Sequence, residues 1–184
     1  MRKSFAAAVL AGSILTATPA LADAPKGGRV EALIGADRIS VDLGGGNGTY
    51  SKSGFTYGGA AGYDVPVGHN LSVGADAEID GATTRIRSGS ARVEAGRDLY
   101  VGGRVTANVA PATNVYVKAG YANARLIARS GSYSYGENGN GVRVGVGLQQ
   151  QFMSNLYGVV EYRYTNYQDD VSRNQVVAGV GLRF

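Results

Sequence analysis

The sequence contains no cysteine, no tryptophan and only one histidine, His69, among its 184 residues. Without cysteine there is no disulfide framework, thiol nucleophile or thiolate metal site. One histidine cannot build most histidine-dependent metal or acid–base sites, and we interpret His69 as a solvated turn residue. No run of 18 apolar residues occurs, which excludes a transmembrane helix. Glycine (29 residues) and tyrosine (12 residues) are abundant instead, and they favour an all-β protein with little catalytic chemistry.

The amino terminus, residues 1–22, has the layout of a secretory signal peptide. A short basic start that includes Arg2 and Lys3 is followed by a small, apolar stretch, and the segment ends in the small-x-small motif Ala-Leu-Ala. The apolar stretch is too short to span a bilayer. We therefore expect cleavage between Ala22 and Asp23.

The mature chain, residues 23–184, has the length of a single domain. Cleavage removes Arg2 and Lys3, two of the 18 basic residues, so the net charge falls from +4 to +2. Dispersed charge of this size gives no indication of a nucleic-acid partner.

Apolar and polar residues alternate with a period of two from residue 28 onward, which predicts β-strands. At the carboxyl end, Val176, Val180 and Leu182 share one face, and Arg183 lies on the other. Most of the expected strands exceed the roughly 5–6 residues of a soluble strand and reach the roughly 9–11 residues that a tilted membrane-spanning strand needs. The expected strands are 28–37, 54–65, 70–80, 93–109, 114–127, 140–152, 156–167 and 176–184.

The connections between these strands alternate in length. Tight turns are expected at 66–69, 110–113 and 153–155, and longer polar loops at 38–53, 81–92, 128–139 and 168–173. Outer-membrane barrels have short periplasmic turns and long external loops. Closure of the sheet also removes the unpaired edges that lipid excludes. The sequence therefore predicts an all-β fold, an eight-stranded antiparallel up-and-down transmembrane β-barrel.

The polar faces of the strands carry charged residues, which we place in the barrel interior because the apolar faces must meet lipid. Eight strands leave an interior that side chains just fill, so acids and bases must pair there. We interpret these residues as a structural network of lumen charges. They are Glu31, Asp64, Asp76, Glu78, Asp80, Glu94, Asp98, Arg104, Lys118, Arg143, Glu161, Arg163 and Arg183. The alternation of Asp76, Glu78 and Asp80 leaves cation binding or paired-carboxylate catalysis as an alternative.

Closing the ring predicts one contact at the periplasmic end. Glu31 lies low on the first strand and Arg183 low on the last, and these strands must adjoin if eight strands close. We therefore expect an ion pair between Glu31 and Arg183.

A second contact is expected around the turn at Pro111. Counting along both strands from this turn places Arg104 nearly opposite Lys118 on the inward face. Like charges opposite each other are destabilising. Asp76 or Glu78 should therefore reach toward Arg104.

Aromatic residues gather at the strand ends, where membrane proteins place interfacial girdles. At the periplasmic end, Phe184 also ends an alternating strand that must pair with the first strand to satisfy both edges in lipid. The expected outer girdle is Phe55, Tyr57, Tyr121, Tyr162, Tyr164 and Tyr167, and the expected periplasmic one is Tyr63, Phe152 and Phe184.

Residues 140–184 resemble the small OmpA/OmpX-like outer-membrane β-barrels, and are most similar to the opacity-type porin family common in alphaproteobacteria. The resemblance is carried by residues 141–148 (GVRVGVGL), by residues 160–167 (VEYRYTNY) and by the terminal strand that ends at Phe184. It implies an outer-membrane location, with Phe184 as the signal that the barrel-assembly machinery reads. The first half of the mature chain departs from the family in sequence.

We expect a non-enzymatic, monomeric outer-membrane protein with an envelope role and four surface loops, without catalytic residues, cofactor or metal. Its expected partners are outer-membrane lipids, lipopolysaccharide and the assembly machinery, together with an extracellular ligand for the loops. A small-solute porin, as the family name implies, and an adhesin acting through residues 38–53, 81–92 and 128–139 stay open as alternatives. An enzyme acting on lipid or peptide is disfavoured, because no histidine lies near the outer loops.

Overall fold

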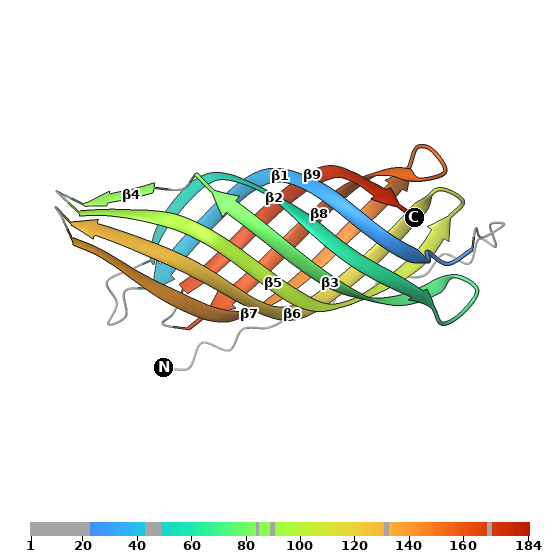
Figure 1. Cartoon of the computed structure of the whole chain (residues 1–184), viewed down its shortest axis with the longest axis horizontal. Coiled ribbons are helices and arrows are strands. Elements are labelled where there is room, and N and C mark those ends of the chain that lie inside the picture. Colours follow the sequence, from blue (N-terminus) through green and yellow to red (C-terminus); the bar gives the residue numbers. More distant parts are fainter. Residues whose placement is uncertain (1–22, 43–48, 84, 89–90, 131–132, 169–170) are drawn as a thin grey trace.

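A computed structural model describes residues 23–42, 49–83, 85–88, 91–130, 133–168 and 171–184 (Figure 1). At 41–42, 49–50, 85–88, 91–95, 126–130 and 133–138 the description is limited to the backbone. The expected signal peptide and Ala22 lie outside the described residues, and Asp23 is exposed at their start. No helix among the described residues is long and apolar enough to cross a membrane.

Nine strands close into a single barrel (Figure 1). All neighbours pair antiparallel, in the order β3-β2-β1-β9-β8-β7-β6-β5, and β3 returns to β5 to complete the ring. The short strand β4 follows β3 along the same side of β5, so the two make one interrupted member of an eight-membered ring. The strands are β1 (Gly27–Asp42), β2 (Thr49–Pro66), β3 (Leu71–Ala82), β4 (Arg85–Ser88), β5 (Ala91–Ala110), β6 (Thr113–Ser130), β7 (Tyr133–Gln151), β8 (Leu156–Tyr167) and β9 (Val171–Arg183). This confirms the expected eight-stranded barrel.

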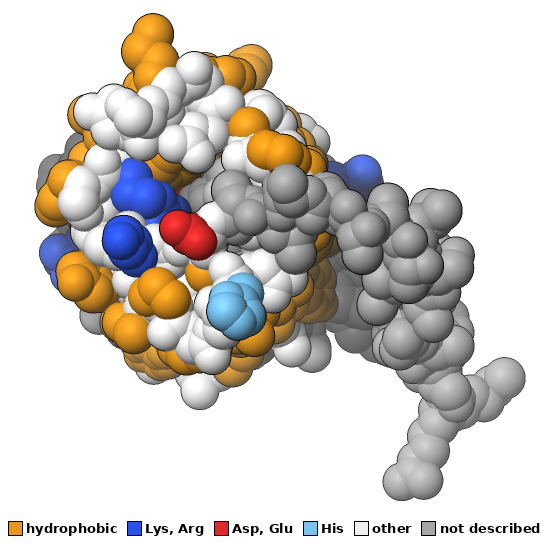
Figure 2. All heavy atoms as spheres, turned by 90° about the vertical axis from the view of Figure 1, so that its right-hand side faces the viewer, with side chains coloured by type: hydrophobic (Ala, Val, Ile, Leu, Met, Phe, Trp, Pro, Cys, Tyr) orange, Lys and Arg blue, Asp and Glu red, His pale blue; other side chains and the backbone are white. Residues whose placement is uncertain are grey.

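The strands form because alternate residues face two different environments, the outer surface and the barrel interior. In β9, Val176 and Val180 are each 54% exposed on the outer surface, whereas Gln175 and Val177, the two neighbours of Val176, are each 1% exposed in the interior. Around the ring, apolar side chains face outward and polar side chains face inward, which is the reverse of a soluble protein. A barrel surrounded by lipid requires this arrangement. Figure 2, viewed toward the end with the tight turns, shows basic and acidic side chains inside a ring of hydrophobic ones.

The three tight turns lie where they were expected. Backbone hydrogen bonds close them, including Val67 N to Leu71 O at 2.9 Å and Phe152 N to Leu156 O at 2.9 Å. They share one end of the barrel with the carboxyl terminus (Figure 1). We take this end as the periplasmic one, because outer-membrane barrels carry their short turns there.

The expected long loops are wrong in extent. Strands run through most of 38–53, 81–92 and 128–139 and through half of 168–173, and β5, β6 and β7 reach 20, 18 and 19 residues. The two ends of the barrel therefore differ because the strands extend farther at the end opposite the tight turns, where we call them overhanging strands. Long loops are not the cause of the difference. Glycine, serine and asparagine keep their backbone donors and acceptors, so adjacent antiparallel strands go on pairing through such segments up to the next turn.

Candidate functional site: the charged lumen

The barrel interior is lined by charged side chains of both signs. Eight carboxylates and six basic side chains among the described residues are buried, and Arg183 adds a half-buried guanidinium at the periplasmic mouth. A charge held away from water needs a partner of opposite sign and hydrogen bonds. The acids are Glu31, Asp37, Asp64, Asp76, Glu78, Asp80, Asp98 and Glu161, and the bases are Arg29, Arg104, Lys118, Arg143, Arg163 and Arg173.

Glu78 on β3 lies at the centre of this network. Its Oε1 accepts hydrogen bonds from Lys118 Nζ and, at 3.2 Å, from Arg163 Nη2. Its Oε2 accepts from Arg143 Nη1 at 3.2 Å. All four side chains are fully buried. One carboxylate therefore joins three cations from β6, β7 and β8.

Two further acids share these cations. Asp80 Oδ2 lies 3.0 Å from Arg163 Nη1 and 3.5 Å from Arg143 Nη1. Glu161 Oε1 lies 2.6 Å from Lys118 Nζ and also accepts from Arg163 Nε. Each buried cation of this central cluster thus contacts at least two carboxylates.

Some of the ion pairs span the whole diameter of the barrel. β3 and β8 lie four positions apart in the ring of eight, on opposite walls, yet Asp80 and Arg163 meet at 3.0 Å. β5 and β9 are also four positions apart, and Arg173 Nη1 lies 2.6 Å from Asp98 Oδ2. Side chains from opposite walls therefore meet across the lumen in two places.

The periplasmic half of the lumen holds a second cluster. Arg104 Nε donates to Asp76 Oδ2 at 2.7 Å, and Arg29 Nη2 donates to the other oxygen of Asp76. The register places Arg104 directly opposite Lys118. Both expectations for this turn region, the opposed bases and the approach of Asp76 to Arg104, are therefore confirmed.

The expected ion pair between Glu31 and Arg183 is wrong. The register places Arg29, rather than Glu31, opposite Arg183, and Arg183 Nη1 donates to Asp64 Oδ2 at 2.7 Å. Glu31 Oε1 instead accepts from Tyr157 OH at 2.7 Å. Alternation fixes which face a residue occupies, but the stagger of the strands decides which residues meet.

Several lumen residues were missed by the sequence reasoning. Arg29 and Asp37 stand on the same alternate positions of β1 as Glu31, so periodicity could have found them. Arg173 was assigned to a loop, but it lies in β9 and contacts Asp37 Oδ1 at 2.7 Å. The side chain of Glu94, which was expected inside, lies outside the described residues.

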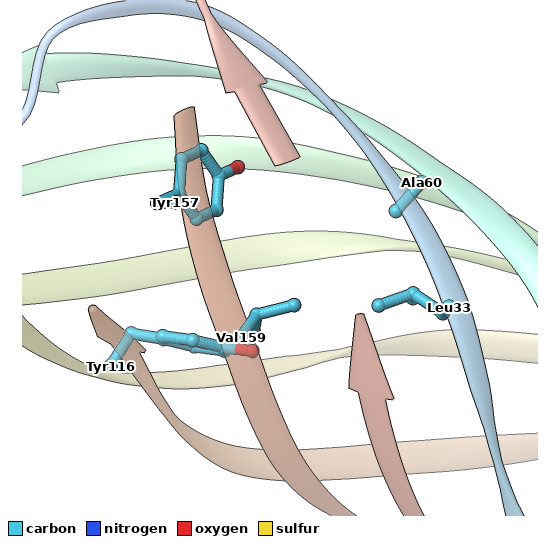
Figure 3. Close-up of a cluster of buried hydrophobic side chains, with 5 residues drawn as sticks. All are labelled: Leu33, Ala60, Tyr116, Tyr157 and Val159. Atoms are coloured by element: carbon cyan, nitrogen blue, oxygen red, sulfur yellow. The ribbon is translucent and has the colours of Figure 1, made fainter. Parts of the chain in front are cut away.

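Tyrosines share the interior with the charges. Tyr116 OH donates to Glu161, and the Arg104 guanidinium carbon lies 3.9 Å from the centre of the Tyr116 ring. The ring fits because Gly147 faces it from β7; a Cβ at Gly147 would collide with the ring. Figure 3 shows Tyr116 with the other members of the small apolar cluster, Leu33, Ala60, Tyr157 and Val159.

The aromatic residues divide between the membrane surface and the lumen. The expected positions at both ends are exposed, from Tyr164 at 38% to Phe184 at 79%, except for Tyr167. Tyr167 is 8% exposed, and its hydroxyl donates to Asp98 Oδ2 at 3.2 Å. Placing Tyr167 in the outer girdle was therefore wrong, because it shares the inward parity of Glu161 and Arg163.

The carboxylates on β3 are engaged by bases. Both oxygens of Asp76 and both oxygens of Glu78 accept hydrogen bonds from buried cations. Among the described residues no group of three or more histidine, cysteine or acidic side chains could hold a metal ion. The geometry therefore favours ion pairing over metal binding or acid–base chemistry for these acids.

Substitution of Arg104 by Ala tests whether this network supports the fold. It leaves Asp76 with one of its two basic partners, and breaking a buried pair costs about 3–5 kcal/mol. We expect a loss of that order in the free energy of unfolding, measured by urea titration of the folded protein in detergent micelles. Arg38→Ala, at an exposed position, is the control and should change little. Equal stability of the two variants would contradict a structural role for Arg104.

The sequence also matches a known family over nearly its whole length. Residues 5–184 fit the family described as the outer membrane protein beta-barrel domain. The chain belongs to this family. It is accordingly a protein of the bacterial outer membrane, and its strands cross the bilayer as a closed barrel. No curated protein matches the chain.

Solved outer-membrane barrels share this fold at low sequence identity. Ail, the attachment invasion locus protein of Yersinia pestis, crystallised with the heparin analogue sucrose octasulfate, is 17% identical (TM-score 0.61; 86% of this chain and 99% of that one). Neisserial surface protein A is 18% identical (TM-score 0.65; 85% and 97%). The N-terminal barrel domain of Pseudomonas aeruginosa OprF is 13% identical (TM-score 0.55; 87% and 100%).

Proposed function

We propose that this outer-membrane barrel is a non-enzymatic, monomeric envelope protein whose lumen conducts no solute and whose outer strands and loops face the surroundings of the cell. The observation that carries the proposal is the pair of contacts across the full diameter, Asp80 with Arg163 and Asp98 with Arg173. All four of these side chains are buried. An aqueous pore would need both contacts to open, and open channels are a property of much larger barrels.

Single-channel recording tests this proposal against the porin alternative. The purified mature protein, refolded and inserted into a planar bilayer, should give no conductance steps, because the ion pairs close the lumen. A 16-stranded porin inserted in the same way is the positive control. Regular steps from the folded wild-type protein would overturn the non-conducting proposal and favour the small-solute channel.

A binding role of the outer segments is the second candidate. It concerns residues 38–53, 81–92 and 128–139, and it is supported by the overhanging strands β5, β6 and β7 and by the fold shared with Ail, which was crystallised with a heparin analogue. Binding residues commonly lie on segments that a rigid scaffold presents. Retention of the folded protein on immobilised heparin at physiological salt would favour this candidate. Elution in the void volume would argue against a sulfated ligand.

We further propose membership of the opacity-type subfamily, export through a signal peptide cleaved between Ala22 and Asp23, and insertion by the barrel-assembly machinery. The composition of residues 1–22 and the motif at residues 160–167 support these assignments. Amino-terminal sequencing of the protein recovered from outer membranes should begin at Asp23. A different first residue would revise the cleavage site without affecting the barrel.

A further inference from the structure

The outer surface of the barrel carries exposed charges of mainly one sign. The exposed charged residues on the strands are Arg38, Lys52, Arg97 and Arg125, while Asp23, an acid, precedes β1 at the periplasmic end. These statements apply to the side chains that the structure describes. The lumen is the reason for this asymmetry, because eight of the acids are buried there against basic partners. Among the described side chains, those exposed beyond the apolar belt are therefore cationic.

A β-bulge brings two of these cations together. Ala95 pairs with Leu126 and Asp98 with Ala124, so Gly96 and Arg97 on β5 both lie opposite Arg125 on β6. A bulge of this kind redirects a side chain and breaks the simple alternation of the strand. Gly96 allows the close approach, since a Cβ there would lie 2.6 Å from the carbonyl oxygen of Arg125. Arg97 and Arg125 are both exposed.

The level of this pair relative to the membrane can be read along β6. Tyr121 is 49% exposed on the outer surface, and its hydroxyl donates to Asn140 Oδ1 at 2.5 Å. Asn123 Nδ2 donates to the same oxygen at 2.7 Å. Tyrosines with satisfied hydroxyls mark the membrane–water interface. Arg125 is four residues beyond Tyr121, about 13 Å along the strand or roughly 10 Å along the membrane normal, which is the level of lipid headgroups.

No described carboxylate balances the two arginines. Asp98, the described acid that follows Arg97 in sequence, is buried in the lumen, where Arg143 and Arg173 donate to it. Two guanidinium groups at opposed positions of adjacent strands repel each other unless an anion lies between them, and guanidinium binds phosphate with paired hydrogen bonds.

We propose that Arg97 and Arg125 form a binding site for the phosphate groups of phosphorylated lipids in the outer leaflet. The two arginines come from adjacent strands and lie just above the apolar belt. A phosphate carried on an acyl-chain anchor reaches them from the side, with its chains along the apolar surface below Tyr121. This inference rests on the proposed orientation, in which the overhanging strands lie outside the cell.

Native mass spectrometry of the folded mature protein in detergent tests the site. The probes are diphosphoryl lipid A, its dephosphorylated form and inorganic phosphate. Each interfacial arginine contributes about fivefold in affinity, so Arg97→Gln/Arg125→Gln should bind diphosphoryl lipid A roughly 25-fold more weakly than wild type. Arg97→Lys/Arg125→Lys, which keeps the charge, should bind within a few-fold of wild type.

The matched control is Arg38→Gln. Arg38 is also exposed near the outer end, but it lies on β1, where its strand partners are Ser53 and Asn174 rather than a second arginine. It should bind lipid A within about twofold of wild type. An equal loss in Arg38→Gln and in the double variant would show diffuse attraction and overturn the paired site.

Other outcomes distinguish a lipid phosphate from inorganic phosphate, and a lipid ligand from a sulfated polysaccharide. Equal binding of the dephosphorylated lipid, or displacement of lipid A by millimolar inorganic phosphate, would overturn a lipid phosphate site. Loss of heparin binding in the double variant without loss of lipid A binding would reassign the pair to a sulfated polysaccharide.

Unheated gel mobility confirms that each variant is folded. Protease cleavage of the overhanging strands on intact cells tests the proposed orientation separately, so the two failures are distinguishable.

Discussion

Replacing Glu78 by Gln should cost the barrel about 3–5 kcal/mol of unfolding free energy. The amide keeps the shape of the carboxylate but removes the charge that faces Lys118, Arg143 and Arg163. Three buried cations are then left with fewer anionic partners. Urea unfolding in micelles, followed by the mobility of unheated samples on a gel, measures the loss.

Two further variants keep this test specific to the ion pairs. Asp23→Asn removes the same charge at an exposed position and should leave the unfolding curve unchanged. Adding Lys118→Met to Glu78→Gln removes one of the three cations that face the lost charge, while Glu161 keeps Arg163 as a partner, and should restore part of the stability. If Glu78→Gln were as stable as Asp23→Asn, the lumen ion pairs would not contribute to the stability of the fold.

Deletion of Phe184 should prevent most of the protein from reaching the outer membrane while leaving export intact. Phe184 N donates to Gly28 O at 2.9 Å, and its ring lies over Gly28, so it extends the β1–β9 pairing that closes the ring. Unpaired backbone groups cost several kcal/mol each in lipid. We expect the variant to accumulate and be degraded in the periplasm, as shown by cell fractionation with unheated and boiled gel samples.

Phe152 supplies the matched control for Phe184. It is 64% exposed at the same end of the barrel, and its ring lies over Gly158 as that of Phe184 lies over Gly28. Phe152→Ala should therefore lose a similar interfacial side chain without affecting ring closure. Equal amounts of Phe152→Ala and of the Phe184 deletion variant in the outer membrane would refute a signal role for Phe184.

Periodicity was sufficient to predict the ring and most of its inward face. Asp76, Arg104 and Lys118 lie where alternate positions placed them, because one pleat faces lipid and the other cannot. Alternation carries no information on stagger, which is why Arg183 meets Asp64 rather than Glu31. A register shift such as the bulge at Gly96 has no signature in the pattern either.

The ends of the strands could not be read from composition. Composition predicts loops for the Gly- and Ser-rich segments, although strand pairing depends on backbone groups that these residues retain. Arg173 was assigned to such a segment and was missed as the partner of Asp98. A charged residue at an inward position of an extended strand is therefore easily mistaken for a loop residue.

The cross-lumen contacts also constrain the assembly of the barrel. Asp80 and Glu78 on β3 precede Arg163 by 83 and 85 residues, so these acids lie far along the chain from one of the cations that balance them. A half-built sheet that ended at β6 would have to carry these acids into the bilayer without the guanidinium groups of β7 and β8. The acids of β3 are fully paired only once β6, β7 and β8 lie in the same barrel, so a shorter sheet would carry uncompensated charge into the bilayer.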